Sequence, residues 1–526
     1  MLRASLQKTC APFGTFISNN VRDISFLPRI GRPGHDLSHN RTAQGTIEPV
    51  THFDLAIIGS GSGNSILNEQ FAGQRVALME KGTFGGTCLN VGCIPTKMFV
   101  YPADVANGVT HASSLGIDAH LNKVHWSQVR DRIFQRIDPI SVAGRSWRAD
   151  NNENVTLYEG HARFTGVREL DTGTGETITA DQIVVAAGSR AVIPDIPGLS
   201  LQQADDKGPR EQPARVHTSD TIMRIDELPR RLAIIGGGFV AAEFAHVFGA
   251  FGSEVTVINR SGAMLREEDH DVSTRFTELA QRRWDVRLHT MTTEVEEYAG
   301  GLRLHLATSG ETSTLDVDTI LVATGRRSNS DGLDLDRTGV EVDEAGLVVV
   351  DEFQRTNVEG IWALGDVSSV YQLKHVSNQD ARVVQHNLLH PDDMVRSDHA
   401  HVPSAVFTEP QIASVGLTEQ MAREQGLRFV TSRQAYGDTA YGWAMEDTTG
   451  FAKVLADPET GRLLGAHLIG AQASNLIQPL IQAMSLGQTA QEAARGQYWI
   501  HPALSEVVEN VLLGLATDEQ ATSTPG

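Results

Sequence analysis

The hydrophobic pattern divides the chain into two similar units and a third region of a different kind. The apolar run 52–58 passes into a glycine-rich turn, and a second run, 75–79, ends in an acidic residue. The runs 231–235 and 254–258 repeat this order around another glycine-rich turn and an apolar helix. Short apolar runs bounded by glycine are typical of buried parallel strands. The sequence therefore predicts two α/β units.

The remaining pattern completes these units and adds a C-terminal domain. We expect a helix at 65–73, an amphipathic helix at 124–149, short antiparallel strands at 155–158 and 160–164, and strands at 182–189, 319–326 and 361–366 that end in small residues. After residue 401, strands followed by helices at 475–486 and 506–513 predict a separate α+β domain. The polar stretch 201–215 predicts an exposed loop.

The first glycine-rich turn nearly matches the fingerprint of dinucleotide-binding proteins. Gly59, Gly61 and Gly63 lie in this turn, and Asn64 occupies the position of the third fingerprint glycine. Glycines there allow a tight turn and let a pyrophosphate approach the backbone at a helix N-terminus. Glu80 follows roughly 20 residues later, where a carboxylate can accept hydrogen bonds from a ribose. We predict a dinucleotide site; the alternative is a glycine-rich turn with a surface glutamate.

The second glycine-rich turn predicts a second dinucleotide. Gly236, Gly238 and Ala241 occupy the fingerprint positions. Asn259 and Arg260 stand where an NAD-binding unit usually carries an acid, and a cation there suits a 2′-phosphate. This favours NADPH, with NADH also possible; alternatively, Arg260 is a solvated surface residue.

A pair of cysteines lies between the two units. Cys88 and Cys93 are separated by four residues, and Pro95 with the apolar run after it indicates that a helix begins near Cys93. A helix N-terminus would stabilise a thiolate. The spacing alone also fits a disulfide or half of a metal site. Near the C-terminus, His501 is followed by Glu506, and the two could form a pair in which the acid orients the imidazole; a structural histidine is the alternative.

Composition excludes several classes of function. The 526 residues include 65 acidic and 44 basic residues, which disfavours a nucleic-acid surface. No apolar run is long enough for a membrane span. Three cysteines are too few to cross-link a chain of this length, so we expect a cytoplasmic protein. Residues 1–50 lack a periodic pattern and predict a disordered extension, with a targeting segment as the alternative.

These motifs, in this order, resemble the pyridine nucleotide–disulfide oxidoreductases over residues 52–515. The resemblance rests on the two glycine-rich turns, the stretch 85–97, the Ala-x-Gly-Asp sequence ending at Asp366, and 501–506. It implies two Rossmann-like dinucleotide-binding domains plus a C-terminal α+β dimerisation domain, as in glutathione reductase. The implied boundaries are 51–193 and 330–400 for the FAD-binding domain, 194–329 for the NAD(P)H-binding domain, 401–518 for the dimerisation domain and 519–526 for a tail.

The resemblance also implies cofactors and roles. FAD would bind the first unit and NADPH the second, in a homodimer whose C-terminal domain lends His501 to the other subunit. Further candidate cofactor-binding residues are Thr87, His161, Ala162, Gly188, Gly325 and Asp366. Electrons would pass from NADPH through the flavin to a Cys88–Cys93 disulfide, after which Cys88 attacks a small-molecule disulfide and Cys93 faces the flavin. Lys97, paired with Glu243, would lie near the flavin; an ordinary surface ion pair is the alternative.

Several substrates fit such a protein. The segments 59–64, 96–101 and 133–139 resemble the mycothione reductases. Residues 98–122 contain no Lys or Arg, which disfavours the carboxylates of oxidised glutathione. Mercuric and large thioredoxin reductases need C-terminal redox residues, and no cysteine follows Cys93. Dihydrolipoamide dehydrogenase, a glutathione reductase-like enzyme, and a flavoprotein subunit of a multienzyme complex remain as alternatives.

Overall fold

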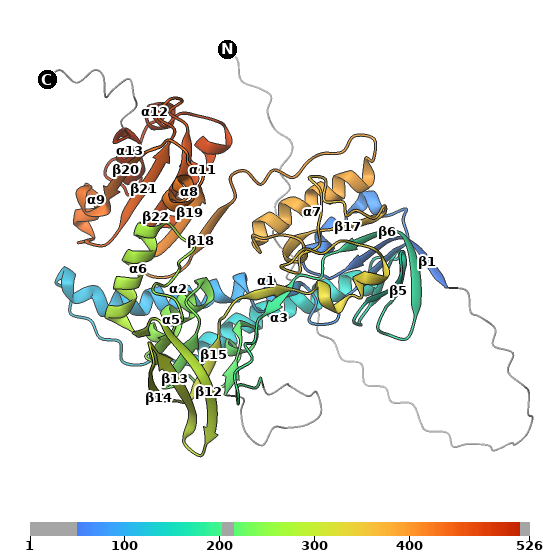
Figure 1. Cartoon of the computed structure of the whole chain (residues 1–526), viewed down its shortest axis with the longest axis horizontal. Helices are drawn as coiled ribbons and strands as arrows, with labels where there is room; N and C mark the ends of the chain where they lie inside the picture. Colours follow the sequence, from blue (N-terminus) through green and yellow to red (C-terminus); the bar gives the residue numbers. More distant parts are fainter. Residues whose placement is uncertain (1–49, 202–214, 516–526) are drawn as a thin grey trace, which may run out of the picture. The chain divides into compact units, whose positions relative to one another are not determined.

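The computed structural model describes residues 50–201 and 215–515 (Figure 1). The predicted extension at 1–50, the predicted loop at 201–215 and the predicted tail at 519–526 lie outside the described residues, apart from Val50, Leu201 and Arg215. Within the described ranges, no helix is both long and apolar enough to cross a membrane.

The first predicted unit forms a mixed sheet in the order β3-β2-β1-β6-β5-β4, with β17 paired to β6. Its strands are β1 (Thr51–Ile58), β2 (Val76–Met79), β3 (Val155–Tyr158), β4 (Arg163–Gly166), β5 (Glu169–Asp171), β6 (Thr177–Val185) and β17 (Ile361–Ala363). The β3-β2-β1-β6-β17 part is parallel, so the C-terminal ends of these buried strands lie along one edge. The chain therefore returns to this sheet at β17, after the strands of the second unit.

The second predicted unit forms an entirely parallel sheet in the order β11-β10-β9-β15-β8. Its strands are β8 (Val216–His217), β9 (Arg231–Ile235), β10 (Glu254–Ile258), β11 (Asp285–Arg287) and β15 (Thr319–Val322). Beside it lies an antiparallel sheet of β12 (Thr290–Tyr298), β13 (Gly301–Thr308) and β14 (Glu311–Val317). The short antiparallel pair of β7 (Ser189–Ala191) and β16 (Arg326–Ser328) joins the two units.

The C-terminal region forms an antiparallel sheet in the order β18-β19-β22-β21-β20, as predicted for an α+β domain (Figure 1). Its strands are β18 (Pro403–Val406), β19 (Gln411–Gly416), β20 (Val430–Ala435), β21 (Phe451–Ala456) and β22 (Leu463–Gly470). Its helices are α8 (Glu419–Glu424), α9 (Ala440–Ala444), α10 (Ala473–Leu476), α11 (Gln478–Ser485), α12 (Ala490–Arg495) and α13 (Glu506–Leu513). The single helix predicted at 475–486 is thus two helices, α10 and α11.

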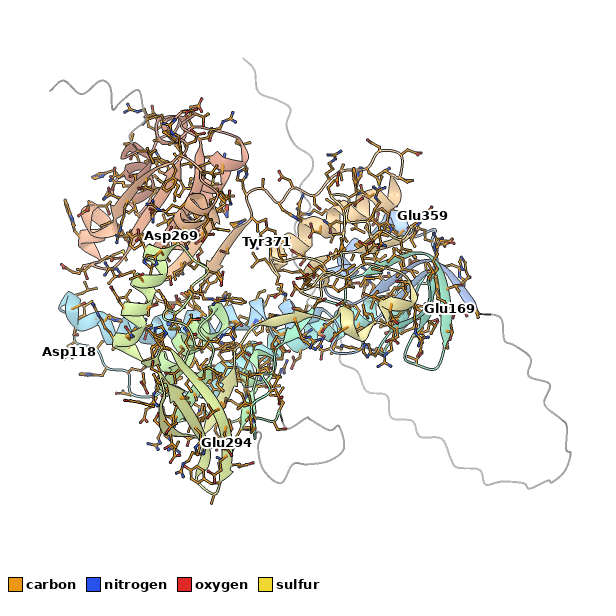
Figure 2. All side chains as sticks on the ribbon, viewed as in Figure 1. Asp118, Glu169, Asp269, Glu294, Glu359 and Tyr371 are labelled. Carbon is orange, nitrogen blue, oxygen red and sulfur yellow. The ribbon has the colours of Figure 1, made fainter. Side chains whose placement is uncertain are left out.

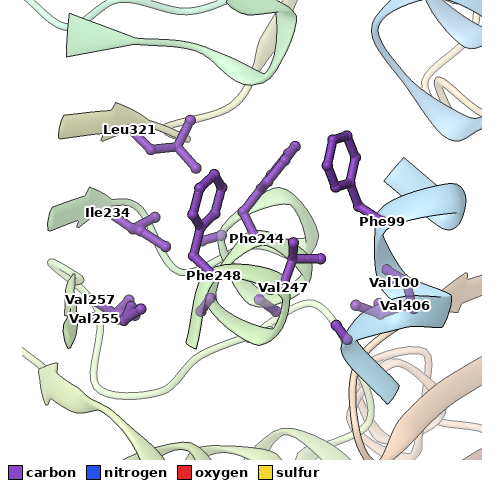
Figure 3. Packing of buried hydrophobic residues seen from close by; sticks show 14 of the residues in the cluster. Phe99, Val100, Ile234, Phe244, Val247, Phe248, Val255, Val257, Leu321 and Val406 are labelled. Atoms are coloured by element: carbon purple, nitrogen blue, oxygen red, sulfur yellow. The ribbon is translucent and has the colours of Figure 1, made fainter. Parts of the chain in front are cut away.

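Several helices of the two nucleotide units share one buried apolar cluster (Figure 3), whereas α7 (Lys374–Leu389) packs in a separate cluster with strands of the first sheet. The helices of the two units are α1 (Gly86–Asn90), α2 (Cys93–His111), α3 (Trp126–Asp150), α4 (Ser219–Ile222), α5 (Phe239–Ala250), α6 (His270–Arg283) and α7. Phe99 of α2 stacks on Trp126 of α3, with ring centroids 5.2 Å apart. The same buried cluster includes Phe244 of α5 and Val406 of β18. One apolar core therefore holds the helix that begins at Cys93 against both the second unit and the C-terminal domain.

The α-helix predicted at 65–73 is absent. Two short 3₁₀ turns, η1 (Gly63–Ile66) and η2 (Glu69–Phe71), take its place. Side chains from other helices satisfy the carbonyls that a helix would have used: Arg148 of α3 donates to the backbone oxygens of Asn64 and Leu67, and Gln385 of α7 donates to that of Ile66. These distant donors remove the need for an α-helix at this position.

Strand β3 is also paired differently from the prediction. We expected an antiparallel strand at 155–158, but β3 pairs in parallel with β2 and extends the nucleotide-binding sheet. The reason is the connection: α3 returns the chain across the sheet before β3, which is the usual crossover between parallel strands.

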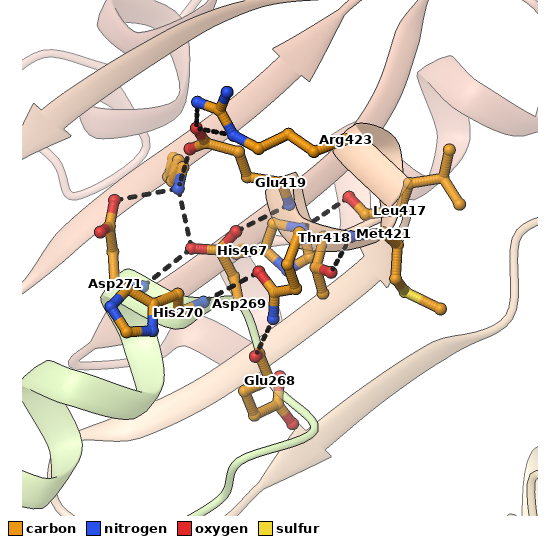
Figure 4. Close-up of polar contacts among 12 residues, drawn as sticks. Glu268, Asp269, His270, Asp271, Leu417, Thr418, Glu419, Met421, Arg423 and His467 are labelled. Carbon is orange, nitrogen blue, oxygen red and sulfur yellow. Dashed lines mark hydrogen bonds and ion pairs between the residues drawn. The ribbon is translucent and has the colours of Figure 1, made fainter. Parts of the chain in front are cut away.

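A buried polar cluster joins α6 to the C-terminal domain (Figure 4). Lys453 of β21 lies 2.9 Å from Asp269, 2.9 Å from Asp271 and 2.6 Å from Glu419. Figure 2 labels Asp269 where α6 meets the C-terminal sheet. Burial acts to lower the pKa of Lys453, but the three carboxylates raise it above its ordinary value. The cluster fixes the C-terminal domain against the second nucleotide unit.

Candidate active site around Cys88 and Cys93

Two close backbone contacts hold the cysteine segment against the first glycine-rich turn. Cys88 lies in α1, and Cys93 is the first residue of α2. Gly86 has φ 71°, and a Cβ added to it would lie 2.6 Å from the Cα atom of Gly61. Only glycine permits such backbone contact. The backbone N–H of Gly85 also donates to the hydroxyl of Ser60 at 2.8 Å, so the cysteine pair lies directly beside the turn that was predicted to bind a dinucleotide.

The two thiols are hydrogen-bonded to each other and differ strongly in acidity. The hydrogen bond from Cys88 lowers the pKa of Cys93 to about 7, and the nearby charge of Lys97 acts in the same direction. The same hydrogen bond, together with burial, raises the pKa of Cys88 far above its ordinary value. In the dithiol form the proton therefore stays on Cys88, and Cys93 becomes the thiolate at the start of a 19-residue helix.

The structure offers no support for the metal interpretation of the pair. Within residues 50–201 and 215–515, no three His, Cys, Asp or Glu side chains are grouped so that they could hold a metal ion. Both cysteines are free thiols, with Cys88 half-buried and Cys93 more exposed. Unequal acidity and partial access are properties of a redox-active pair rather than of a structural disulfide.

Lys97 and Glu243 form the ion pair that the sequence suggested. The Lys97 Nζ atom lies 2.6 Å from the Glu243 Oε1 atom, and the Glu243 side chain is only 9% exposed. The same carboxylate accepts a hydrogen bond from the backbone N–H of Phe407 at 2.9 Å, and the Lys97 ammonium lies 4.3 Å from the centre of the Phe407 ring. The pair is therefore not an ordinary surface contact, because it joins α2, α5 and the end of β18.

The first glycine-rich turn is built as predicted. Gly59 has φ 110°, and a Cβ there would lie 2.3 Å from the backbone oxygen of Ala186. Glu80, just after β2, accepts hydrogen bonds from the backbone N–H and the hydroxyl of Ser60 and from the backbone N–H of Gly82. Its carboxylate is thus held at the mouth of the turn, where a ribose hydroxyl could reach it.

Gly63 and Asn64 serve the packing of this turn. A Cβ at Gly63 would lie 2.7 Å from the Ala186 side chain. The side-chain oxygen of Asn64 accepts a hydrogen bond from Arg148 at 2.7 Å. The Asn64 side chain is therefore bound to α3, and any contact with a cofactor would come from its other atoms.

The second glycine-rich turn repeats the geometry of the first. Gly236 has φ 131°, and a Cβ there would lie 2.1 Å from the backbone oxygen of Ala323. Gly238 and Ala241 follow at the start of α5, with open space beside Gly238. In each unit the first fingerprint glycine therefore packs against the backbone oxygen of an alanine that follows a neighbouring strand.

Asn259 and Arg260 have different environments. Asn259 is buried over the second turn, and its side chain donates to the backbone oxygen of Ala263 at 2.8 Å. Arg260 is exposed and makes no hydrogen bond or ion pair with the other described residues. Asn259 therefore shapes the loop, whereas Arg260 presents a free cation after β10.

The remaining predicted cofactor-binding residues lie around the same two sheets. Asp366 accepts a hydrogen bond from the Ser189 hydroxyl at 2.7 Å, and Arg326 donates to that hydroxyl at 2.9 Å. Gly188 and Gly325 both have positive φ and open space where a side chain would be. Thr87 lies in α1 next to Cys88, and His161 and Ala162 follow β3 at the edge that also carries Glu80.

His501 and Glu506 form the predicted pair. The His501 Nδ1 atom lies 2.7 Å from the Glu506 Oε1 atom. The His501 side chain is 71% exposed, while that of Glu506 is 18% exposed. The Nε2 atom of His501 forms no hydrogen bond with any other residue that the structure describes. No described contact joins His501 to either cysteine, so a single chain does not assemble all the predicted catalytic residues.

Sequence reasoning missed three participants in this region: Ser60, Phe407 and Lys374. Ser60 links Glu80 to α1, and Phe407 contacts both members of the Lys97–Glu243 pair. Lys374 begins α7 and donates to the hydroxyl of Ser62 in the first glycine-rich turn at 2.8 Å. A hydroxyl residue between fingerprint glycines could have been noticed, but the contacts of Phe407 and Lys374 depend on the tertiary fold.

Family models decide the relationship of this chain to known proteins. Residues 53–381 match the model described as pyridine nucleotide-disulphide oxidoreductase, and residues 402–512 match the dimerisation domain of that family. The chain belongs to the pyridine nucleotide-disulphide oxidoreductase family. Members of this family are FAD-dependent oxidoreductases. The fold predicted from the sequence, with two dinucleotide-binding domains and a C-terminal α+β dimerisation domain, is confirmed.

Individual members of the family differ in their similarity to this chain. A mycothione reductase of Mycobacterium tuberculosis is 53% identical over 472 residues, which cover 88% of this chain and 99% of that protein. A dihydrolipoyl dehydrogenase of Corynebacterium glutamicum is 32% identical over 485 residues, covering 88% and 98%. The solved structure of the HOCl-induced flavoprotein disulfide reductase RclA from Escherichia coli has a TM-score of 0.75 and 28% identity, covering 88% and 99%.

Proposed function

We propose that this protein is an NADPH-dependent mycothione reductase, which reduces the disulfide of mycothiol through a redox-active cysteine pair. The observation that carries the proposal is the 53% identity with a mycothione reductase across 99% of that protein, against 32% for a dihydrolipoyl dehydrogenase. The unequal acidity of Cys88 and Cys93 supports it, because Cys93 can persist as a thiolate while Cys88 keeps its proton until a base removes it for attack on a disulfide.

The cofactor sites follow from the two glycine-rich turns. We infer that FAD binds at Gly59, Gly61 and Glu80, in a domain formed by 51–193 and 330–400; β17 belongs to the same sheet as β1, which supports this division. NADPH would bind at Gly236 and Gly238, in the domain 194–329, with the free cation of Arg260 available for the 2′-phosphate.

The same inference covers the remaining candidate contacts. We expect Thr87, His161, Ala162, Gly188 and Asp366 to line the FAD site. Gly325 belongs with the NADPH side of the molecule. The positive φ of Gly188 and Gly325 supports close approach of a ligand to the backbone, because neither glycine has another neighbour at its open side.

The roles of the catalytic residues follow from their acidity and hydrogen bonds. When bound, FAD supplies the transfer of an electron pair from the nicotinamide to the cysteine disulfide. Cys93, the more acidic thiol, remains as a thiolate. Cys88, as its thiolate, attacks one sulfur of the substrate disulfide, whose S–S bond breaks, so that the first thiol leaves and a mixed disulfide remains on Cys88. Cys93 then attacks the Cys88 sulfur, the Cys88–Cys93 bond re-forms, and the second thiol of the substrate leaves. The positive charge of Lys97 stabilises the Cys93 thiolate, and the ion pair with Glu243 keeps Lys97 in position.

His501 and Glu506 would complete the site from a second subunit. Glu506 binds the Nδ1 atom, so the Nε2 atom of His501 is the one that can accept the Cys88 proton and return it to the departing thiol. The His501 side chain is 71% exposed in the single chain, so it is accessible to a second subunit. The match of residues 402–512 to a dimerisation domain, which we assign as 401–518, supports a homodimer. In this dimer each site would combine the cysteines of one subunit with the histidine of the other.

The proposal is tested by steady-state rates of the purified full-length protein on mycothione, oxidised glutathione and lipoamide, each with NADPH and with NADH. We expect a clear preference for mycothione with NADPH. A preference for lipoamide with NADH would instead identify a dihydrolipoamide dehydrogenase, and a preference for glutathione would identify a glutathione reductase. The Cys88→Ser variant controls for rates that do not pass through the cysteine pair.

A further inference from the structure

Lys374 is a cation without a counter-charge in the described part of the chain. It is the first residue of α7, a helix of 16 residues, and its side chain is half-buried. Its Nζ atom donates to the Ser62 hydroxyl at 2.8 Å. No carboxylate of residues 50–201 or 215–515 forms an ion pair with it. A half-buried ammonium that is bonded to a neutral hydroxyl is poorly compensated and favours a nearby anion.

Three elements meet at this ammonium group. Ser62 belongs to the first glycine-rich turn, and the backbone of that turn touches α1 where Gly61 meets Gly86. The charge of Lys374 also reaches Cys88 of α1, where it acts to lower the pKa of that thiol against the stronger effect of Cys93. The ammonium thus lies where the dinucleotide turn, the cysteine pair and the N-terminus of α7 come together.

Two carboxylates in this region, those of Glu80 and Asp366, accept hydrogen bonds from donors other than Lys374. Glu80 accepts hydrogen bonds from Ser60 and Gly82, and Asp366 accepts one from Ser189. The protein therefore brings a cation to the turn and keeps its own acids engaged with other donors. In a dinucleotide-binding unit, the anion that approaches this turn is the pyrophosphate of the cofactor.

We propose that Lys374 is a phosphate-binding residue of the FAD site, which supplies the positive charge for the cofactor pyrophosphate at the turn containing Ser62. Glycine-rich turns of this kind bind pyrophosphate through backbone N–H groups, which carry only partial charges. A lysine adds a full point charge and three donors. In this protein that charge comes from the start of α7, more than 300 residues after the turn in the sequence. The proposal rests on FAD binding at the first unit, and not on the identity of the disulfide substrate.

The test is an FAD titration of full-length protein from which the cofactor has been removed. We expect Lys374→Met to weaken FAD binding by roughly 10- to 100-fold, the range for loss of one hydrogen bond between charged groups. Lys374→Arg should retain most of the affinity, because it keeps the charge. Lys123→Met, which removes an exposed lysine outside both nucleotide turns, is the matched control and should bind FAD like the wild type.

Two further measurements separate a phosphate contact from a general disturbance of the turn. The salt dependence of FAD affinity should be weaker in Lys374→Met than in the wild type, since one charged contact is gone. ADP should bind the variant less tightly, while adenosine, which has no phosphate, should bind it equally well. Lys374→Gln serves as a second neutral variant should the methionine variant fail to fold.

The proposal would be overturned by unchanged FAD and ADP affinity in both neutral variants. It would also be overturned by an equal loss of ADP and adenosine binding, which would assign Lys374 to the folding of the turn. These measurements use neither mycothione nor NADPH. A wrong substrate assignment therefore leaves the outcome for Lys374 unaffected, and failure at Lys374 leaves the substrate assignment unaffected.

Discussion

The ammonium group of Lys97 lies 2.6 Å from the carboxylate of Glu243. Both charges act on Cys93, in opposite directions: Lys97 lowers the pKa of that thiol, and Glu243 raises it. The hydrogen bond from Cys88 and burial have larger effects on this pKa, and the two members of the ion pair adjust it in opposite directions. Substitutions of Lys97 and Glu243 should therefore be distinguishable although they break the same contact.

We predict that Lys97→Met raises the pKa of Cys93 and that Glu243→Gln lowers it. The rate of Cys93 alkylation in the reduced protein, followed as a function of pH with the product located by mass spectrometry, measures both changes. Lys123→Met controls for the loss of a lysine charge elsewhere. If both variants shifted the alkylation profile in the same direction, the effect would be a structural disturbance and the electrostatic account would be wrong.

The hydrogen bond from Cys88 has the largest effect on Cys93, and this gives a second prediction. Cys88→Ala removes the donor and should raise the pKa of Cys93 above about 7, so that less thiolate is present at neutral pH. Cys88→Ser keeps a hydroxyl donor and should preserve most of the low pKa. Both variants should bind FAD and lose disulfide turnover. Full turnover in Cys88→Ser would show that the attacking thiol has been assigned wrongly.

Mixing two inactive variants tests whether each site is shared between subunits. A hybrid dimer of Cys88→Ser and His501→Ala subunits contains one site with both cysteines and an intact histidine from the other subunit. We expect activity to appear when the two variants are mixed under conditions that exchange subunits, with differently tagged chains confirming that hybrids form. Confirmed hybrids without activity would place His501 and the cysteines of the same chain in one site.

Arg260 should determine the choice between the two nicotinamide cofactors. It is exposed after β10 and has no partner among residues 50–201 and 215–515, whereas the Asn259 side chain is hydrogen-bonded within its loop. Arg260→Gln should raise the KM for NADPH and leave the KM for NADH nearly unchanged, because only NADPH carries the 2′-phosphate. Arg266→Gln, which changes an exposed arginine paired with Glu267, is the control. Equal effects on both cofactors would exclude a phosphate contact at Arg260.

The strands and glycine-rich turns were predictable because they depend on local pattern. The runs before Gly59 and Gly236 are buried strands, and both glycines need positive φ and have no room for a side chain. The absence of the helix predicted at 65–73 could not be foreseen from local pattern. Its carbonyls are satisfied by Arg148 and Gln385, which lie far away in the sequence and arrive only with the tertiary fold.

The candidate site shows the same division. The pair His501–Glu506 was expected from its spacing and the pair Lys97–Glu243 from the family resemblance, and the structure brings the members of each pair together. Lys374 carries no motif of its own, and its relation to Ser62 exists only because α7 begins beside the first turn. The contact between Cys88 and a His501 from another subunit remains a prediction.

The buried cluster around Lys453 gives the last prediction, which concerns stability. The Lys453 side chain is 4% exposed and that of Asp269 is fully buried, so removal of the lysine leaves carboxylates without their partner. Lys453→Met should lower the free energy of unfolding by about 3–5 kcal/mol at neutral pH. Arg230→Gln, which breaks an exposed pair with Glu254, should cost less than about 1 kcal/mol.

The pH dependence of this difference identifies its electrostatic origin. The hydrogen bond from Lys453 lowers the pKa of Glu419; for Asp269, burial acts to raise the pKa, but the Glu419 N–H and Lys453 bring it below its ordinary value. Their stabilisation is present above the unfolded pKa values of about 4 and is lost as the pH falls through the lower folded values. The raised pKa of Lys453 contributes stability below about pH 10, which is lost as the pH rises through the folded value.

The difference in the free energy of unfolding between wild type and Lys453→Met, measured by urea unfolding, should therefore be largest between these pH limits and shrink at both ends. A difference that stayed constant across the whole range would indicate lost packing around the lysine stem instead of a lost charge.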